Sequence, residues 1–442
     1  MKANRLAARI LIILMVSIPL NAEIKKTVLK NNTTLITDAD SSSQTSIIQI
    51  CIKGGKGAEP LSKAGLAYLT TRLSIDLPDS QKRKRILEMA SKFESRITTH
   101  FCLITISCLS EHTADTLEIF SDVFSKPLIS ALRISRFKNH MKYLQKSEKD
   151  RDLEQVSQTL RAQFIKSPEF HGSVFGTSES LKQIKRDDII RFYRNYFNGS
   201  HITVAASSSL PESALIDLLT RCLDRLPTGS PVNLIPWKMK PPDKRDIHIF
   251  RQKTQFLIAR GTVSPEINPV NFPRVFLLES LLGKGIGSEL WTLRETDQLA
   301  YLVDSHSDIT LHGGIFFVYL KTNPEQWILA RQKFARLMTS LVSDALSPDS
   351  FEAHKNYAAA DFFRLVESKK MRTFYLAYFE SFGPGYDYLG RIPAILKHIQ
   401  LDDFLPFLQQ ILSPDKQINF TIGPTRQPDT ASRKPQASAT VW

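Results

Sequence analysis

The sequence predicts a two-domain protein of mixed α/β or α+β class, because one pattern of helices and strands occurs twice. In the first copy a helical pattern at residues 187–192 leads to a strand at 201–206, and in the second copy residues 402–407 lead to a strand at 417–422. The offset is about 215 residues, far longer than the repeat of a solenoid protein. The order strand, helix, strand, helix within each copy indicates sheets covered by helices.

Length and composition agree with this organisation. With 442 residues, 42% of them hydrophobic and 23% charged, the chain is too long for one typical core and too apolar for a disordered protein. At least two packed domains are expected.

The elements of the first copy follow from hydrophobic spacing. Alternating apolar and β-branched residues predict strands at residues 27–37, 46–53 and 96–108. A helix is predicted after Pro60, because apolar side chains recur there at the spacing of one helical face, at Leu66, Leu69 and Leu73. Two further helical patterns occupy residues 113–124 and 136–144.

The second copy mirrors these elements. Residues 256–262 correspond to the strand at 47–53, residues 276–282 to the helix after Pro60, and residues 314–321 to the strand at 96–108. Between the copies, residues 227–246 contain five prolines and are predicted to form a stiff, extended linker. The resulting domains are residues 23–226 and 247–423, and the polar tail at 424–442 is predicted to be disordered.

The N-terminus has the layout of a secretory signal. Lys2, Arg5 and Arg9 precede an apolar run at residues 10–20, and Ala22 offers a cleavage site. The run is shorter than the roughly 20 apolar residues that span a bilayer, and no later stretch approaches that length. We expect a signal peptide at residues 1–22, export to the bacterial periplasm and no stable membrane span, with an uncleaved N-terminal anchor as the alternative.

Charge and cysteine content exclude other classes. The net charge of +14 is spread along the chain, so nucleic acid is not expected as a partner. The densest basic run, residues 82–85, opens a helical pattern. A solvated helix start is therefore favoured there over a binding site for an acidic or peptide partner. The four cysteines have no CxxC spacing, which excludes a disulfide scaffold or a zinc ribbon. Cys102 and Cys108 share one face of a predicted strand, where buried thiols are favoured over a bridge.

Five segments carry a resemblance to a known family. They are LKNNTTLIT at Leu29, IKGGKGAEP at Ile52, KAGLAYLTTRL at Lys63, FGTSESLKQIKRDDIIRFYRNYF at Phe175 and LLGKGIGSELWTLRETDQLAYLV at Leu281. The chain resembles the pitrilysin/insulinase family of inverted-zincin metallopeptidases, of the bacterial and mitochondrial processing type. The resemblance implies an α+β fold of two tandem homologous domains, each a largely antiparallel sheet packed against helices.

The zinc motif of that family is absent. Active members carry HxxEH, in which two histidines one helical turn apart bind zinc and the glutamate acts as general base. Alignment on residues 65–67 places Tyr68, Thr71 and Arg72 at those three positions, and the resemblance places Lys142 or Tyr143 at the third ligand. Arginine and lysine stay protonated and repel a metal cation, and no two of the ten histidines are three or four residues apart. We expect this chain to hold no zinc of its own.

Two residues of the second copy match the family's substrate-contacting pair. Arg294 and Tyr301 are seven residues apart, close to two helical turns, so they share a face if the segment is helical as far as Tyr301. The resemblance implies that they hold the substrate backbone and polarise the scissile carbonyl. The alternative is that Arg294 pairs with Glu295 or Asp297 and that Tyr301 packs on Leu299.

The glycines Gly283, Gly285 and Gly287 lie just before this pair. No Lys-Ser or Lys-Thr follows them, so a flexible loop is favoured over a phosphate cradle. They loosely resemble a substrate-handling loop of the noncatalytic subunit of the mitochondrial processing peptidase.

The combined prediction is an exported, noncatalytic subunit of a heterodimeric zinc peptidase. The partner, a homologous zinc-bearing subunit, supplies HxxEH, while this chain supplies Arg294, Tyr301 and half of a chamber around a peptide. An extended peptide can add to the sheet edge near residues 96–98, because main-chain pairing depends little on side-chain identity. The alternative is a stand-alone peptide-binding or scaffold protein derived from a peptidase.

Overall fold

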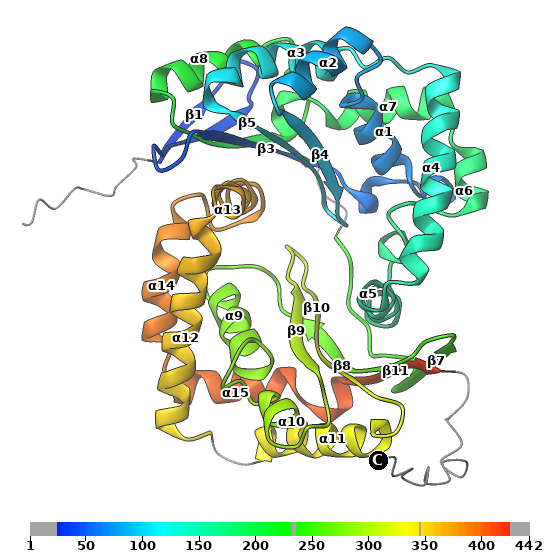
Figure 1. The fold of residues 1–442 in the computed structure, drawn as a ribbon, viewed down its shortest axis with the longest axis vertical. Coiled ribbons are helices and arrows are strands. Elements are labelled where there is room, and N and C mark those ends of the chain that lie inside the picture. Colours follow the sequence, from blue (N-terminus) through cyan, green and yellow to red (C-terminus); the bar gives the residue numbers. More distant parts are fainter. Residues whose placement is uncertain (1–23, 232–235, 344–345, 425–442) are drawn as a thin grey trace, which may run out of the picture.

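The computed structural model describes residues 24–231, 236–343 and 346–424, and it consists of two halves that each contain one sheet (Figure 1). The predicted signal peptide at 1–22 and all but the first residue of the predicted tail at 424–442 lie outside the described residues. Within the described ranges no helix is long and apolar enough to cross a membrane.

The first half contains a six-stranded sheet in the order β1-β2-β6-β3-β5-β4. All neighbouring strands are antiparallel except β2 and β6, which are parallel. The strands are β1 (Lys25–Val28), β2 (Thr34–Ala39), β3 (Thr45–Lys53), β4 (Lys92–Ile97), β5 (Phe101–Leu109) and β6 (Ile202–Ser208). Helices above this sheet in Figure 1 bury apolar side chains against one of its faces. They and their neighbours are α1 (Leu66–Ser74), α2 (Ser80–Glu88), α3 (Thr113–Ser125), α4 (Ala131–Lys149), α6 (Ser178–Gln183), α7 (Arg186–Tyr196) and α8 (Glu212–Leu223).

The second half contains a five-stranded sheet in the order β7-β11-β8-β10-β9. The strands are β7 (Asp246–Arg251), β8 (Phe256–Ser264), β9 (Leu302–Asp308), β10 (Gly314–Thr322) and β11 (Ile418–Pro424). The helices are α9 (Asn271–Leu282), α10 (Trp291–Glu295), α11 (Trp327–Ser343), α12 (Pro348–Glu367), α13 (Lys369–Phe382), α14 (Tyr388–His398) and α15 (Leu401–Ile411). Only the β7–β11 pair is parallel.

The two sheets repeat one topology. The order β2-β6-β3-β5-β4 corresponds to β7-β11-β8-β10-β9, and in each sheet the parallel pair is the first of these pairs. Strand β6 follows α7 and strand β11 follows α15, as the repeat in the sequence predicts. The predicted α+β fold with two tandem homologous domains is therefore confirmed.

Two predicted strands are each a pair of strands. The strand predicted at 27–37 is β1 and β2, because the chain turns between them at Asn32, whose φ is 69°. The strand predicted at 96–108 is the hairpin β4–β5, in which the Thr98 hydroxyl oxygen accepts hydrogen bonds from the backbone N–H groups of His100 and Phe101. A threonine that bonds its own backbone in this way stabilises a turn. Alternation alone does not reveal either turn.

The halves exchange one helix each. Helix α5 (Asp152–Phe164) belongs to the first half in sequence, but its residues Val156, Leu160 and Phe164 pack on the second sheet, against residues such as Phe317. Conversely, α13 packs on the free face of the first sheet, which is the face opposite to α1. Each fully buried side chain of this kind contributes about 1.5–3 kcal/mol. Each sheet is thus covered on one face by its own half and on the other by its neighbour.

Polar contacts hold α13 on the first sheet. Arg372 forms ion pairs with Asp38, at 2.7 Å, and with Asp40. The ammonium group of Lys369 donates to the backbone oxygens of Asp40, Ser43 and Thr45. Burial raises the pKa of the Asp40 carboxyl, but two hydrogen bonds from Ser42 and the hydrogen bond and charge of Arg372 outweigh burial and lower this pKa to about 2.

The described part of the predicted linker, residues 227–231 and 236–246, is anchored to both halves. The Trp237 side chain is buried, its indole N–H donates to the His312 backbone oxygen at 2.6 Å, and its ring meets the Phe170 ring edge-on. Further along, Met239 forms an isolated β-bridge with Ile165. This part of residues 227–246 therefore contributes to the packing between the halves.

Two smaller predictions are confirmed. All four cysteines are buried free thiols, and burial raises the pKa of the Cys102 thiol to about 12. Residues 82–85 lie near the solvated start of α2, which Asp79 caps by accepting hydrogen bonds from the backbone N–H groups of Gln81 and Lys82.

Candidate functional site

The start of α1 is fixed by a buried carboxylate. Glu59 accepts hydrogen bonds from the backbone N–H groups of Gly65 and Ala67, at 2.9 and 2.6 Å. These N–H groups lie at the positive end of the helix and have no partner within it. Burial raises the pKa of Glu59 to about 7 in spite of these bonds and of the nearby Lys56 ammonium. Glu59 therefore orients the helix that carries the family's zinc motif in active members.

The three α1 positions that match the zinc motif hold packed, non-ligating side chains. Tyr68 meets the Phe175 ring edge-on with centroids 4.9 Å apart. Thr71 is fully buried, and its hydroxyl donates to the Ala67 backbone oxygen at 2.8 Å. The Arg72 guanidinium lies 5.9 Å from the centre of the Phe137 ring. No set of three His, Cys, Asp or Glu side chains able to hold a metal occurs in the described ranges.

Met141 of α4 packs towards α1. Its side chain is fully buried in the same core as Leu66 and Leu69 of α1. Lys142 and Tyr143, which the sequence comparison placed at the third ligand position, are exposed to solvent, Tyr143 by 66%. A shift of one residue turns a helical side chain by about 100°, so these two side chains point away from the core that holds Met141. The thioether of Met141 is not among the usual ligands of protein zinc sites.

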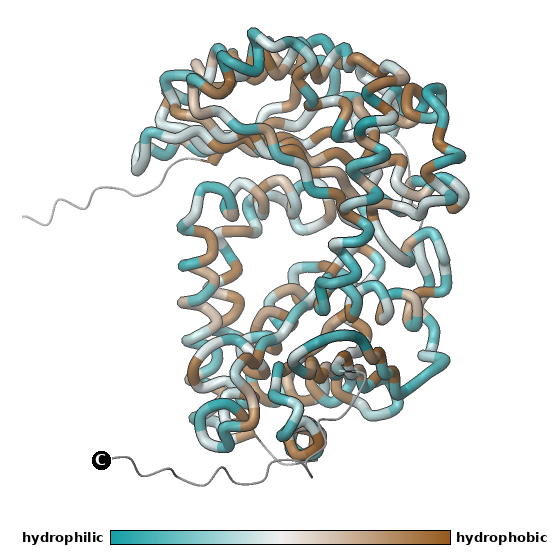
Figure 2. Tube along the Cα trace, turned by 45° about the vertical axis from the view of Figure 1, so that its right-hand side comes forward, coloured by the Kyte–Doolittle hydropathy of each residue, from teal (hydrophilic) through white to brown (hydrophobic). Residues whose placement is uncertain are grey.

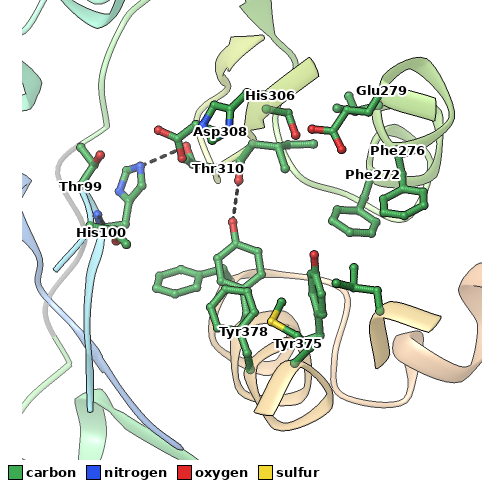
Figure 3. A pocket seen from close by; sticks show the side chains of 18 of the residues that line it. Thr99, His100, Phe272, Phe276, Glu279, His306, Asp308, Thr310, Tyr375 and Tyr378 are labelled. Carbon is green, nitrogen blue, oxygen red and sulfur yellow. Dashed lines mark hydrogen bonds between the residues drawn. The ribbon is translucent and has the colours of Figure 1, made fainter. Parts of the chain in front are cut away.

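Two cavities, each partly open to solvent, lie between the halves. The first, called here the α1-side cavity, has a volume of about 390 Å³. It is bordered by α1, the C-terminal end of α4 and α5, through Tyr68, Glu148 and Arg161. The second, the α13-side cavity, has a volume of about 380 Å³ and lies between α9, β9 and α13 (Figure 3). Both cavities are lined by one set of residues at the β4–β5 turn and on β9: Arg96, Thr98, Thr99, His306, Ser307 and Asp308.

The α1-side cavity is lined by paired charges. Arg161 bridges Asp308, at 3.4 Å, and Glu154, at 3.8 Å. Glu148 is buried, which raises the pKa of its carboxyl, and its nearest cation is Arg151 at 4.0 Å. None of these residues is among the sites predicted from the sequence. Glu154 and Arg161 lie on α5, which reaches the site only through the exchange of helices.

The β4–β5 turn contacts the second half directly. The His100 ring nitrogen Nε2 lies 3.0 Å from the Thr310 hydroxyl. Burial lowers the pKa of His100 to about 4, so the ring is neutral at neutral pH. The His100 ring also packs against the linker residue Trp237, and the two ring centres are 4.6 Å apart.

Arg294 and Tyr301 do not share a helical face. Helix α10 ends at Glu295, and Gln298 has a φ of 52°, so the chain leaves the helix before Tyr301. The Arg294 guanidinium lies 4.5 Å from the centre of the Trp291 ring, while the Tyr301 hydroxyl donates to Gln255. Neither residue lines the two cavities.

The alternative ion pair of Arg294 with Glu295 or Asp297 is not formed in the described part of the chain. Asp297 pairs with Lys333 at 2.5 Å, and Arg294 forms no ion pair within the described part of the chain. Leu299 is buried, whereas Tyr301 is 43% exposed. Both members of the pair therefore present polar groups at the molecular surface.

The glycine loop has a structural explanation. A side chain at Gly283 would overlap the backbone of Asp304, with a Cβ only 2.5 Å from its carbonyl carbon. Gly285 has a φ of 83°, a conformation that favours glycine. Between the loop glycines, Ile286 is 78% exposed, and Lys284 pairs with Glu279. The loop thus presents one apolar side chain to solvent beside the α13-side cavity.

Two repeated α+β halves exchange helices around the cavities between them. This architecture defines the class of protein, and comparison with known families identifies the family. Residues 34–178 match the model of the insulinase family (peptidase family M16), and residues 183–357 match the peptidase M16 inactive domain. The chain belongs to peptidase family M16. It is a member that lacks the HxxEH motif.

Characterised relatives are distant. The beta subunit of the mitochondrial-processing peptidase of Neurospora crassa is 20% identical over 47% of this chain and 44% of its own length. The non-peptidase homolog YmxG of Helicobacter pylori is 21% identical over 62% of this chain and 65% of its own. A core protein I of the mitochondrial ubiquinol–cytochrome-c reductase complex of Euglena gracilis is 22% identical over 54% of this chain and 49% of its own. The matched region thus spans about half to two thirds of these relatives.

Solved structures share the fold over nearly the whole chain. A peptidase M16 inactive domain from Pseudomonas fluorescens superposes with a TM-score of 0.79 at 16% identity, covering 91% of this chain and 99% of that one. A protease from Helicobacter pylori gives 0.79 at 15% identity, covering 91% and 100%. The periplasmic protease PqqL from Escherichia coli gives 0.71 at 14% identity, covering 95% of this chain and 49% of that one. The predicted resemblance to processing-type members of the family is confirmed.

Proposed function

We propose that this chain is an exported, noncatalytic subunit of a heterodimeric M16 peptidase that binds peptide substrates. The partner is a homologous subunit that carries HxxEH and the catalytic zinc, and this chain needs no cofactor of its own. The observation that carries the proposal is the state of α1. The helix keeps its buried N-terminal anchor, Glu59, while the zinc-facing positions hold Tyr68, Thr71 and Arg72.

The donor chemistry at these positions supports a role without metal. Zinc requires deprotonated nitrogen, oxygen or sulfur ligands. The Arg72 guanidinium offers only donors, and the Thr71 hydroxyl is used in a bond to the helix backbone. The single-chain cavities, in contrast, remain large enough to hold parts of a peptide.

The positions of Arg294 and Tyr301 support a role towards another chain. Both lie at the surface and outside this chain's own cavities. Stacking on Trp291 limits the motion of the Arg294 guanidinium, and the bond to Gln255 orients the Tyr301 hydroxyl. Donors held in place in this way can stabilise the developing oxyanion of a peptide bond in the partner's active site.

Relatives support pairing between homologous subunits. The Neurospora relative is a peptidase subunit, and the Euglena relative is a core protein of a respiratory complex. Export to the periplasm is proposed from the basic residues and the apolar run at residues 1–22.

The test is an Arg294→Ala variant in the assembled pair. The mature chain, tagged at its C-terminus, is isolated from its own host, and proteins that copurify near stoichiometry are identified by mass spectrometry. We expect a homologue with intact HxxEH, and at least a tenfold loss of peptide hydrolysis in the variant.

Arg391→Ala is the matched control. Arg391 is also an exposed arginine above an aromatic ring, that of Tyr388 at 5.7 Å, but it lies on α14. Unchanged turnover in the Arg294 variant, with the pair still assembled, refutes the role in trans.

A stand-alone peptide-binding protein is the second candidate. One observation favours it: strands β4 and β9 lie at the free edges of their sheets, and residues of both strands line the cavities of this single chain. Isolation of the chain with bound peptides and without a homologue supports this second candidate.

A further inference from the structure

We infer that the cavities select extended peptides in which a bulky aromatic side chain is flanked on both sides by polar ones. The aromatic side chain enters the α13-side cavity, and its neighbours point to the α1-side cavity. The inference rests on the peptide-binding part of the proposed function and adds the class of peptide.

The α13-side cavity has an aromatic wall. Phe272 and Phe276 on α9 line the cavity together with Tyr375 and Tyr378 on α13 (Figure 3). Phe374 on α13 also lines it, and the Phe272 ring meets the Tyr375 ring edge-on with centroids 6.0 Å apart. The cavity volume of about 380 Å³ leaves room for one large side chain. Aromatic rings pack well against other rings in edge-to-face or offset geometry. The wall therefore fits phenylalanine, tyrosine or tryptophan.

One polar group of this wall has no partner. The Tyr378 hydroxyl donates to the Ile309 backbone oxygen at 2.6 Å. The Tyr375 hydroxyl points into the cavity in Figure 3 and forms no hydrogen bond within the described ranges. Tyr375 is half-buried, so its hydroxyl is accessible from the cavity. A bound side chain or its backbone can accept this hydrogen bond.

The α1-side cavity is the more densely charged of the two. Its wall carries the cations Lys56, Arg151 and Arg161 and the anions Glu148, Glu154 and Asp308, beside aromatic residues such as Phe175. An apolar side chain placed among the charged groups would displace water without replacing its hydrogen bonds, which is unfavourable. A polar or charged side chain can replace them. This cavity therefore favours polar side chains.

The sheet places the two cavities so that one strand can reach both. Helix α1 covers one face of the first sheet and α13 the other. Along β5, Cys102 and Ile104 lie in the core that contains α1, while Phe101 and Leu103 lie in the core that contains α13. Arg96 and Thr98, at the end of the edge strand β4 and in the turn after it, line both cavities. Side chains of a strand added to this edge point alternately to the two faces of the sheet. Consecutive peptide residues therefore enter opposite cavities.

Two isomeric peptides test the inference on the isolated chain. Leu-Ser-Lys-Phe-Glu-Ser-Leu places charged residues beside the phenylalanine, and Lys-Ser-Leu-Phe-Leu-Ser-Glu places leucines there with the same composition. Both carry one N-terminal fluorophore, and binding is measured by fluorescence anisotropy. We expect the first peptide to bind at least tenfold more tightly than the second.

Variants that fill the α13-side cavity locate the effect. Leu365→Trp on α12 and Met371→Trp on α13 each extend a side chain that lines this cavity, and each is expected to weaken binding of the first peptide at least tenfold. Phe363→Trp, two residues along α12 and 57% exposed, is the matched control and is expected to bind as the parent chain does. Two filling variants are used because one of them can fail to fold, which circular dichroism shows.

The outcomes separate this inference from the proposed function. Equal binding of the two peptides, or full binding by a folded filling variant, overturns the inference and leaves the proposed subunit role standing. Absence of binding by both peptides to the folded chain overturns the inference and also removes the peptide-binding part of the proposed function.

Discussion

The exchange of helices predicts that a substitution in the first half of the sequence destabilises the second half of the structure. Leu160 of α5 is fully buried against the second sheet, where it lies directly on the backbone of Gly261. Leu160→Ala removes carbon groups that contribute about 0.8 kcal/mol each through transfer from water. It also leaves a void against a rigid sheet, so the total loss of folding free energy is about 3–4 kcal/mol.

The chain carries its own reporters for this measurement. All four cysteines lie in the first half, while Trp291 and Trp327 lie in the second. Trp237 is buried between the halves, so it is replaced by phenylalanine in every variant compared. Urea unfolding followed by tryptophan fluorescence then reports on the second half, and the reactivity of the buried thiols with a coloured disulfide reagent reports on the first. We expect both transitions of Leu160→Ala to move together to lower urea, because each half covers one face of the other's sheet.

Leu87→Ala provides the matched control. This leucine lies on α2 and is 79% exposed, so the same chemical change should alter stability by about 0.5 kcal/mol or less. A fluorescence transition that stays in place in Leu160→Ala would show that α5 does not stabilise the second sheet. A thiol transition that stays in place while the fluorescence transition moves would show that the halves unfold independently.

Two further predictions concern pH and metal. Burial raises the pKa of Glu59 from 4.5 to about 7, so the folded chain binds the proton more tightly than the unfolded chain, and this group lowers the stability of the fold as pH rises from about 4.5 through 7. In urea unfolding, the stability of Glu59→Gln relative to the parent chain should therefore be higher at pH 8 than at pH 5. A difference that stays constant with pH would contradict this. Metal analysis of the purified chain should find far less than one zinc per chain, and near-stoichiometric zinc that resists mild chelation would contradict the assignment of Tyr68, Thr71 and Arg72 as non-ligating residues.

The fold could be predicted from the sequence to the extent that it depends on local patterns. The repeat, the strands β3, β8 and β10 and the helices α1 and α9 follow from hydrophobic spacing and from the order of elements. The hairpin β4–β5 did not, because its turn is made by the hydroxyl of Thr98, a residue that is also common in strands.

The site was harder to predict than the fold because it is assembled from distant segments. The loss of the zinc ligands on α1 is visible in the sequence, since the family motif is contiguous. Helix α4 begins five residues earlier than the pattern indicated, and the burial of Met141 beside the exposed Lys142 and Tyr143 depends on the rotation of that helix, which the pattern does not give. The contributions of Arg161 and Tyr375 depend on contacts between helices and sheets of different halves, for which a single sequence holds no local signal.

The position of α13 has a consequence for how this chain is made. The apolar face of the first sheet that includes Cys51, Phe101 and Leu103 is covered by a helix that begins more than 250 residues later, at Lys369. During synthesis, that face emerges long before its cover and is open to aggregation in the interval. The first half therefore reaches its final form only near the end of translation. A chain truncated before Lys369 exposes the apolar face of the first sheet, even though residues 24–231 are present.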